Sequence, residues 1–228
     1  MNESAANRLV DVAIIGDGPA GSALSLACAR VGVDVALVGD DAEWGATYST
    51  WADELPGPGT GGLVNVDDVR STSSAEVWAH GARSHRLLRR YVTLDNGRLR
   101  AALRAGGGHR VGRVDRVTTA QVGDAGGHLV ELVDGTSIRA RVVIDSTGWP
   151  ARFAARDASQ TPAWQTALGV VLADPPAGDL GRPTFMDFRR VVGPDGAPSS
   201  VGPHGVTTFC YSLPVHDGWM VEETVLAA

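Results

Sequence analysis

A glycine pattern near the N-terminus constrains the fold more than any other feature of this chain. Residues 10–15 form an almost unbroken apolar run, and Gly16, Gly18 and Gly21 follow at the G-x-G-x-x-G spacing. Such a run is typical of a parallel strand covered on both faces. The stretch "SALSLACARVG" then predicts a small-residue helix that ends at Gly32, and "VDVALV" predicts a second strand. We therefore predict a βαβ unit that binds a dinucleotide.

The residues of this turn suit a pyrophosphate group. Gly16 permits the tight turn, Gly18 lets the backbone approach the phosphates, and Gly21 lets helix and strand pack closely. Pro19 and Ala20 begin the helix, where unpaired N–H groups and the helix dipole favour anions. We predict that the segment from Gly16 to Gly21 binds the phosphates.

The second strand departs from the expected pattern at its end. The acidic residue that holds the ribose in such folds would fall at position 39, which is Gly. Asp40 and Asp41 come directly after it. Either Asp40 takes the ribose-binding role through a slight register change, or the ribose contact is weaker than usual.

Composition excludes several other classes of function. All 20 basic residues are Arg, so neither a lysine Schiff base nor a P-loop lysine is possible. The net charge of -6 argues against a nucleic-acid partner. The one basic stretch, "SHRLLRRY" (residues 84–91), is interpreted as a solvated helix face. The six histidines lack ligand-like spacing, so we predict no metal site.

Later segments favour a flavin. Residues 127–150 predict a hairpin around a two-residue Asp134-Gly135 turn, followed by a buried strand "RVVID" that leads to Thr147 and Gly148. This arrangement resembles FAD-binding proteins of the glutathione-reductase and hydroxylase type, in which the Thr-Gly turn closes over the cofactor. The stretch "YVTLDNGRLRAAL" resembles the helix entry of that group. Relatives usually have Arg where this chain has Asn96, which puts a flavin contact from that position in doubt.

Four further segments narrow the resemblance. They are "ATYSTWADEL" (46–55), "FMDFRR" (185–190), "TFCYSLP" (208–214) and "MVEET" (220–224). In this order, together with the glycine motif, they resemble the flavoprotein lycopene cyclases from Asp11 to Ala228. Family members continue well beyond the Glu-Glu-Thr segment, so the chain resembles an N-terminal portion: a truncated product, a split enzyme or a fragment.

The resemblance implies an α/β fold, specifically an FAD/NAD(P)-binding Rossmann-like fold of the glutathione-reductase type. The resemblance also implies that a β-rich substrate domain is interleaved with it and that the fold is incomplete at the C-terminus. We expect an FAD-binding domain over residues 1–150, with an inserted segment around 45–95, and the start of the substrate domain over 151–228.

Two acid pairs are the catalytic candidates. Cyclising a linear polyene end group needs a proton donor in a water-poor site, stabilisation of a carbocation and a base. Glu222 and Glu223 follow an apolar run, and two adjacent carboxyls in such a setting cannot both ionise cheaply, so one is expected to stay protonated. In a strand they point to opposite faces, so one alone faces the substrate. Asp53 and Glu54 are candidates for a supporting acid or base.

Aromatic residues could stabilise the carbocation. The candidates are Trp51, Trp149, Phe185, Phe188 and Tyr211, although core packing is the ordinary role of such rings.

The resemblance implies a lycopene β-cyclase that changes no net redox state. Reduced FAD would stabilise the cation, and NADPH would be the external reductant. Since a carotenoid partitions into lipid, we expect a cytoplasmic protein attached to the membrane periphery, with a second chain as a possible supplier of the missing part. The alternatives are a flavin-dependent oxidoreductase (a monooxygenase or prenyl reductase) and an inactive nucleotide-binding remnant.

Overall fold

The computed structural model describes residues 9–57, 59, 61–122, 125–155, 159, 162–189 and 207–226. These residues form two compact units. Those within Met1–Ala46, Gly57–Asn65 and Asn96–Asp157 make the first unit, and those within Thr47–Pro56, Val66–Asp95 and Ala158–Ala228 make the second. The chain passes repeatedly from one unit to the other, which confirms the predicted interleaving. Residues 47–56 and 66–95, most of the expected insertion, belong to the second unit.

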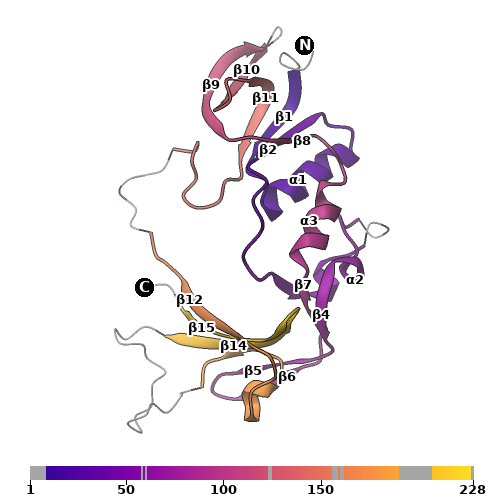
Figure 1. Cartoon of the computed structure of the whole chain (residues 1–228), viewed down its shortest axis with the longest axis vertical. Helices are drawn as coiled ribbons and strands as arrows, with labels where there is room; N and C mark the ends of the chain where they lie inside the picture. The colour runs from indigo at the N-terminus through magenta and orange to yellow at the C-terminus, as the bar shows by residue number, and fades with distance from the viewer. Residues whose placement is uncertain are drawn as a thin grey trace. The chain divides into compact units, whose positions relative to one another are not determined.

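The first unit contains a six-stranded sheet in the order β8-β2-β1-β11-β10-β9 (Figure 1). Its strands are β1 (Leu9–Ile15), β2 (Val35–Gly39), β8 (His109–Val111), β9 (Val114–Val122), β10 (Ala125–Leu132) and β11 (Ser137–Asp145). β8, β2, β1 and β11 run parallel, whereas β10 is antiparallel to both β11 and β9. Helices α1 (Pro19–Arg30) and α3 (Asn96–Arg104) pack against each other beside this sheet. This is the predicted Rossmann-like βαβ unit.

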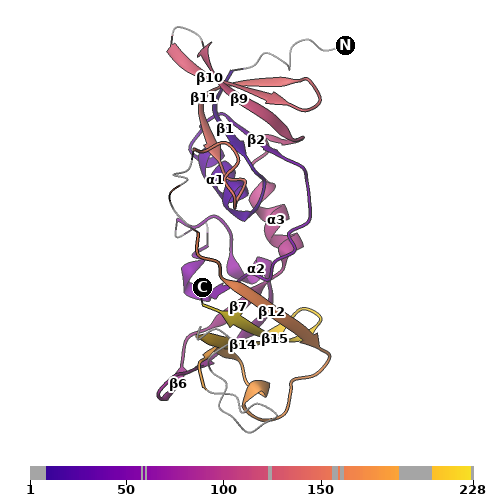
Figure 2. The same ribbon diagram turned by 90° about the vertical axis from the view of Figure 1, so that its left-hand side faces the viewer.

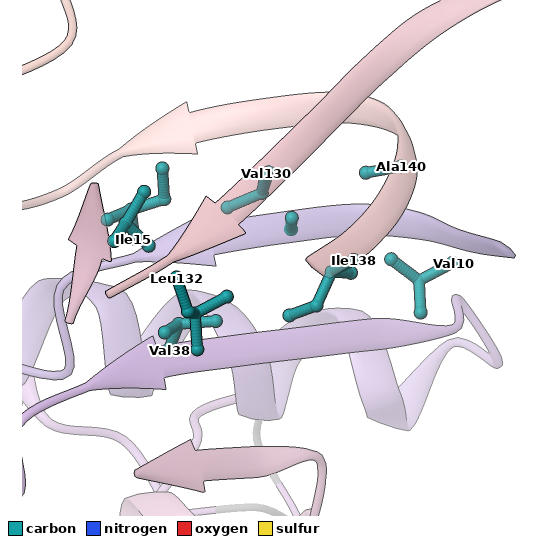
Figure 3. Packing of buried hydrophobic residues seen from close by; sticks show 9 residues of the cluster. Val10, Ile15, Val38, Val130, Leu132, Ile138 and Ala140 are labelled. Atoms are coloured by element: carbon teal, nitrogen blue, oxygen red, sulfur yellow. The ribbon is translucent and has the colours of Figure 1, made fainter. Parts of the chain in front are cut away.

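The core of the first unit explains why these segments pair. Side chains from β1, β2, β9, β10 and β11 meet in one apolar cluster, which Figure 3 shows. Its buried members are Val10, Ala13, Ile15, Val38, Val114, Val130, Leu132, Ile138 and Ala140. In β1, the side chains of Val10, Ala13, Ile14 and Ile15 are buried. The apolar run before Gly16 is therefore a covered strand, as predicted.

Two local predictions need correction in this unit. α1 ends at Arg30, before Gly32, which has a φ of +79°. The β10–β11 hairpin is present, but its turn is longer than the two-residue turn predicted. The Leu132 amide donates to the Thr136 carbonyl, and Gly135 alone in the turn has a positive φ. The Asp134 carboxylate accepts a hydrogen bond from the Thr136 amide at 2.9 Å, which stabilises the longer turn.

The second unit contains two sheets (Figure 2). The larger has the order β12-β15-β14-β13-β5-β6 and the smaller the order β3-β7-β4. The strands of the larger are β5 (Val77–His80), β6 (Ser84–Leu87), β12 (Thr166–Leu172), β13 (Thr184–Asp187), β14 (Thr208–Val215) and β15 (Gly218–Val225). The smaller contains β3 (Ser49–Trp51), β4 (Arg70–Ser74) and β7 (Tyr91–Leu94); the helical turns are η1 (Ala52–Glu54), α2 (Val66–Val69) and η3 (Gly178–Gly181). The unit is β-rich, as expected.

The basic stretch 84–91 is not the solvated helix face that was predicted. It forms β6 and the start of β7. Its arginines are paired with acids: Arg86 with Glu76, Arg90 with Asp67, and Arg89 with both Asp53 and Glu54. The strands rule out the predicted helix, and the ion pairs offset the positive charge of this stretch.

Candidate cofactor and substrate sites

A cavity of about 450 Å³ opens at the carboxyl ends of the parallel strands in the first unit. Such an edge is where open α/β sheets bind ligands. Every predicted cofactor residue lines it except Gly21: Gly16, Gly18, Pro19, Ala20, Asp40, Thr147 and Gly148. The cavity is also lined by Asp17, Gly112, Arg113, Arg152 and Phe153, which sequence reasoning missed. Gly112, Arg113, Arg152 and Phe153 carry no motif of their own, and the pairing of distant strands brings them to this edge. Asp17 had a signal, since it lies between Gly16 and Gly18 of the glycine motif.

The three motif glycines differ in what surrounds them. Gly16 has a φ of +103°, and a Cβ there would lie 2.4 Å from the Ser146 carbonyl oxygen. A Cβ at Gly21 would lie 2.0 Å from the Gly16 carbonyl oxygen, so helix and turn touch at this point. A Cβ at Gly18 would meet no protein atom within 4 Å. The open space at Gly18, at the N-terminus of α1, fits a phosphate group that approaches the backbone closely.

The turn after β11 is fixed by Asp145. Its Oδ1 accepts the Thr147 hydroxyl at 2.7 Å and the Thr147 amide at 3.0 Å, and its Oδ2 accepts the Phe153 amide at 2.7 Å. Burial opposes ionisation of Asp145, but these hydrogen bonds outweigh it and hold the pKa below its ordinary value. The Ser146 hydroxyl donates to the Gly16 carbonyl at 2.8 Å, which ties this turn to the glycine turn.

Asn96 has a structural role at its position. Its Nδ2 donates to the Trp44 carbonyl at 2.6 Å and to the Ala46 carbonyl at 2.9 Å. The side chain therefore holds the segment after β2 onto the start of α3. Asp40, the candidate ribose ligand, is exposed, and its Oδ1 accepts the Ala42 amide within its own loop at 3.1 Å.

The second unit contains a connected group of aromatic rings, here called the aromatic cluster. Trp51 lies 4.8 Å from Tyr91 and 5.4 Å from Phe185, and Phe185 lies 5.9 Å from Tyr211. Phe209 joins Tyr211 to Phe188 at centroid distances of 5.0 and 5.2 Å. Most pairs are edge-to-face or tilted, the arrangements that aromatic rings favour.

Four of the five predicted aromatic residues belong to this cluster. The fifth, Trp149, lies in the first unit and is half exposed. Sequence reasoning missed Tyr91 and Phe209. Phe209 had a signal, since it stands two residues before Tyr211 on a strand and so shares its face. No sequence pattern predicted Tyr91 as a member of the cluster, because its position depends on how the strands of the smaller sheet pair.

Glu222 and Glu223 are neighbours on β15, and their side chains point to opposite faces of the sheet. Glu222 is paired with Tyr211 of β14 and with Gly169 of β12. It shares a face with Met220, which packs with Tyr91 in the core of this unit. Glu223 is paired with Cys210 and Leu168 on the opposite face and is exposed. The side chain of Glu222 is half-buried at the edge of the aromatic cluster, and the Thr224 hydroxyl donates to its Oε1 at 3.3 Å.

Space for the Glu222 carboxyl comes from the neighbouring strand. A Cβ at Gly169 would lie 3.3 Å from the Glu222 Cβ and 3.5 Å from its Oε2. The cluster nearby is strongly desolvated: burial raises the pKa of Tyr91 to about 12, with smaller contributions from Tyr211 and Glu54. Burial also raises the pKa of Tyr211, and the charge of Glu222 adds to that effect.

The second acid pair is held by one arginine. Arg89 Nη2 lies 2.7 Å from Asp53 Oδ1 and 3.0 Å from Glu54 Oε1, and its guanidinium lies 4.7 Å from the centroid of Trp51. The hydrogen bond from Arg89 holds the pKa of Asp53 below its ordinary value. This geometry suits Asp53 as a base or a negative charge better than as a proton donor.

The fold and the cavity define a class: an α/β protein with a Rossmann-like glycine turn beside a cavity and an interleaved β-rich unit. Solved structures share this fold. Peptidyl tryptophan dihydroxylase QhpG has a TM-score of 0.62 at 22% identity, over 97% of this chain and 47% of that one. The Pseudomonas aeruginosa protein PqsL, described as "a probable FAD-dependent monooxygenase", has a TM-score of 0.62 at 16% identity, over 96% and 60%.

The chain belongs to the lycopene cyclase family, whose model ("Lycopene cyclase protein") matches residues 11–228. It is 26% identical to the chloroplastic lycopene beta cyclase of Arabidopsis thaliana, over 100% of this chain and 46% of that protein. An uncharacterized carotenoid cyclase of Deinococcus radiodurans is 31% identical over 96% of this chain and 50% of that one. The chain thus spans about half the length of the curated relatives it matches. The family resemblance read from the sequence is confirmed.

Proposed function

We propose that this chain carries the FAD-binding and acid-bearing parts of a carotenoid cyclase that converts the linear end group of lycopene to a β-ring. Family membership supports the reaction class. The placement of Glu222 carries the assignment of the acid, since β15 directs it toward the aromatic cluster and directs Glu223 away.

The chemistry moves one proton in and one proton out. Glu222 protonates the terminal double bond, the electrons of a neighbouring double bond close the ring, and a base removes a proton from the resulting cation. Substrate and product therefore have equal mass. The ring faces of the aromatic cluster are suited to stabilise the cation. Asp53 and Glu54 share one arginine, Arg89, so the three side chains together leave one net negative charge in this unit.

The cofactor proposed for the first unit is FAD. Gly16 and Gly18 would bind its pyrophosphate at the N-terminus of α1, and the turn at Thr147 and Gly148 would close over the cofactor. Reduced flavin would supply a negative charge that stabilises the cation without net oxidation, and NADPH is the proposed reductant. We also propose peripheral membrane attachment and a second segment or chain that completes the enzyme.

Replacing each glutamate by glutamine tests the acid. The chain is co-expressed in lycopene-accumulating bacteria with the C-terminal half of a family member, and cyclised product is quantified by chromatography and mass spectrometry. Glu222→Gln keeps shape and hydrogen bonding but removes the acid, so we expect a loss of about 100- to 10,000-fold. Glu223→Gln is the matched control and should remain near the parent rate.

Other outcomes reassign the roles. If Glu223→Gln is inactive and Glu222→Gln active, the two glutamates exchange roles. If both variants are fully active, the acid lies elsewhere, and Glu54 becomes the first residue to test. Flavin content should stay at the parent level in both variants, because neither glutamate lines the cavity of the first unit.

A flavin-dependent monooxygenase is the second candidate, since structures with the same fold include PqsL, described as "a probable FAD-dependent monooxygenase". Mass spectrometry separates the two. A product heavier than lycopene by one oxygen atom would favour the monooxygenase, and a product of unchanged mass favours the cyclase.

A further inference from the structure

The ribose-binding acid is missing from its usual place at the end of β2, where this chain has Gly39. The structure shows what fills that place. A Cβ at Gly39 would lie 1.9 Å from Cγ of Asp17 and 2.2 Å from its Oδ1. The first distance is little more than a carbon–carbon bond of about 1.5 Å. The Asp17 carboxylate therefore occupies the space in which an acidic side chain at position 39 would begin.

Asp17 is the middle residue of the first Gly-x-Gly of the motif, and it is held firmly. Its exposed fraction is 7%, and it lines the cavity of the first unit. Three groups bind its Oδ2: Arg104 Nη2 at 2.5 Å, His109 Nε2 at 3.1 Å and the Asp41 amide at 3.2 Å. Within the part of the chain that the structure describes, no hydrogen bond reaches Oδ1. One oxygen is thus fixed and the other remains available as an acceptor.

We propose that Asp17 is the ribose-binding carboxylate of the nucleotide site. Oδ1 accepts a hydrogen bond from a hydroxyl of the adenosine ribose, while Arg104, His109 and the Asp41 amide hold Oδ2 and fix the carboxylate in place. This inference rests on the proposed function in taking the ligand to be FAD. In this chain the ribose-binding acid would come from the glycine turn after β1, whereas in the usual pattern it comes from the end of β2.

The arrangement also explains Gly39. Because the Asp17 carboxylate fills the space beside it, any side chain at position 39 would displace that carboxylate. The absence of an acid there is therefore compatible with a working nucleotide site. It does not indicate an inactive remnant.

A cation is a poorer occupant of this place. Asp17, Asp41 and His109 bring ligand atoms within 4.8 Å of one another. However, Arg104 pairs with both carboxylates. The guanidinium already supplies the positive charge that a metal ion would bring, so the cluster is better suited to orient Asp17.

Binding of ribose-modified nucleotides to the full chain tests the proposal. The probes are FAD, ADP, 2′-deoxy-ADP and 3′-deoxy-ADP, measured by isothermal titration calorimetry. A hydrogen bond to a charged group predicts that Asp17→Gly weakens ADP and FAD binding by about 10- to 100-fold. The parent should bind one deoxy analogue more weakly than ADP by a similar factor, and Asp17→Gly should bind that analogue and ADP equally.

Two further variants separate this role from a purely structural one. Asp17→Gly/Gly39→Asp moves the carboxylate to the strand end and should recover most of the lost affinity for ADP but not for the deoxy analogue. Gly39→Ala leaves Asp17 unchanged but forces its carboxylate to move, so it should also lose the discrimination between ADP and its deoxy form. Gly45→Ala is the control, since a Cβ there meets no atom within 4 Å.

The outcomes distinguish the two proposals. If the parent binds FAD and ADP, but Asp17→Gly binds them as tightly or loses the same factor for ADP and both deoxy analogues, the inference is wrong and FAD binding stands. If the parent binds neither FAD nor ADP, the nucleotide assignment itself fails, and the ribose contact with it. Circular dichroism and thermal unfolding establish that each variant is folded before binding is measured.

Discussion

Gly18 differs from its neighbours in the glycine turn because nothing in the protein occupies the space where its side chain would be. Valine at this position should therefore fold normally but fill the place of the pyrophosphate. We expect Gly18→Val to unfold at the parent temperature and to lose most of its FAD affinity, because the valine side chain would occupy the place of the pyrophosphate. Flavin fluorescence titration and thermal unfolding measure the two effects.

Gly21→Val is the matched comparison at the residue scale. Its Cβ would lie 2.0 Å from the Gly16 carbonyl, so this variant should lose stability as well as binding. Undiminished FAD affinity in Gly18→Val would falsify the phosphate assignment. Loss of folding in that variant would show that the space is needed by the protein itself.

At the scale of elements, the turn after β11 depends on one carboxylate. Since the pKa of Asp145 is held below its ordinary value of 3.8, its hydrogen bonds stabilise the fold above about pH 3.8. This contribution is lost as the pH falls through the lowered pKa. Asp145→Asn should therefore lower the free energy of unfolding at pH 7 by about 1–2 kcal/mol. The difference in the free energy of unfolding between the parent and Asp145→Asn should shrink as the pH is lowered below 3.8.

Urea unfolding of parent and variant at pH 7, 5 and 3.5 measures this dependence. A deficit of the same size at every pH would mean that the side chain acts through its shape alone. Thr147→Val is a useful companion, because it removes one donor and leaves the Phe153 amide bound to the carboxylate.

At the scale of the whole molecule, the proposed substrate is a lipid-soluble polyene. No helix among the described residues is long and apolar enough to span a membrane. β12 contains no charged residue, and it exposes Leu168, Val170 and Val171 by 80%, 55% and 58%. We propose that this strand contacts the lipid surface, with Leu168 and Val170, which share one face, entering the interface.

Vesicle flotation tests the lipid contact. The chain should float with phosphatidylcholine vesicles. Leu168 and Val170 share one face of β12, and replacing both by serine should weaken vesicle binding by about 100-fold or more, since each buried apolar side chain contributes about 1.5 kcal/mol or more. Leu88→Ser is the control, because Leu88 is also exposed but lies outside β12. Equal flotation of all three proteins would place the lipid contact elsewhere, and no flotation of the parent would remove it.

The sequence by itself determined the parts of this protein that depend on local pattern. The apolar run before Gly16, the glycine spacing and the alternation of Glu222 and Glu223 are set by neighbouring residues, so they could be read in advance. Tertiary structure decided what depends on distant pairing. It brought the side chain of Asp17 beside Gly39, Arg89 onto Asp53 and Glu54, and Tyr91 beside Trp51. Such contacts form when strands far apart in the chain pair and bury their apolar side chains together. The local sequence pattern of each strand does not specify its partner.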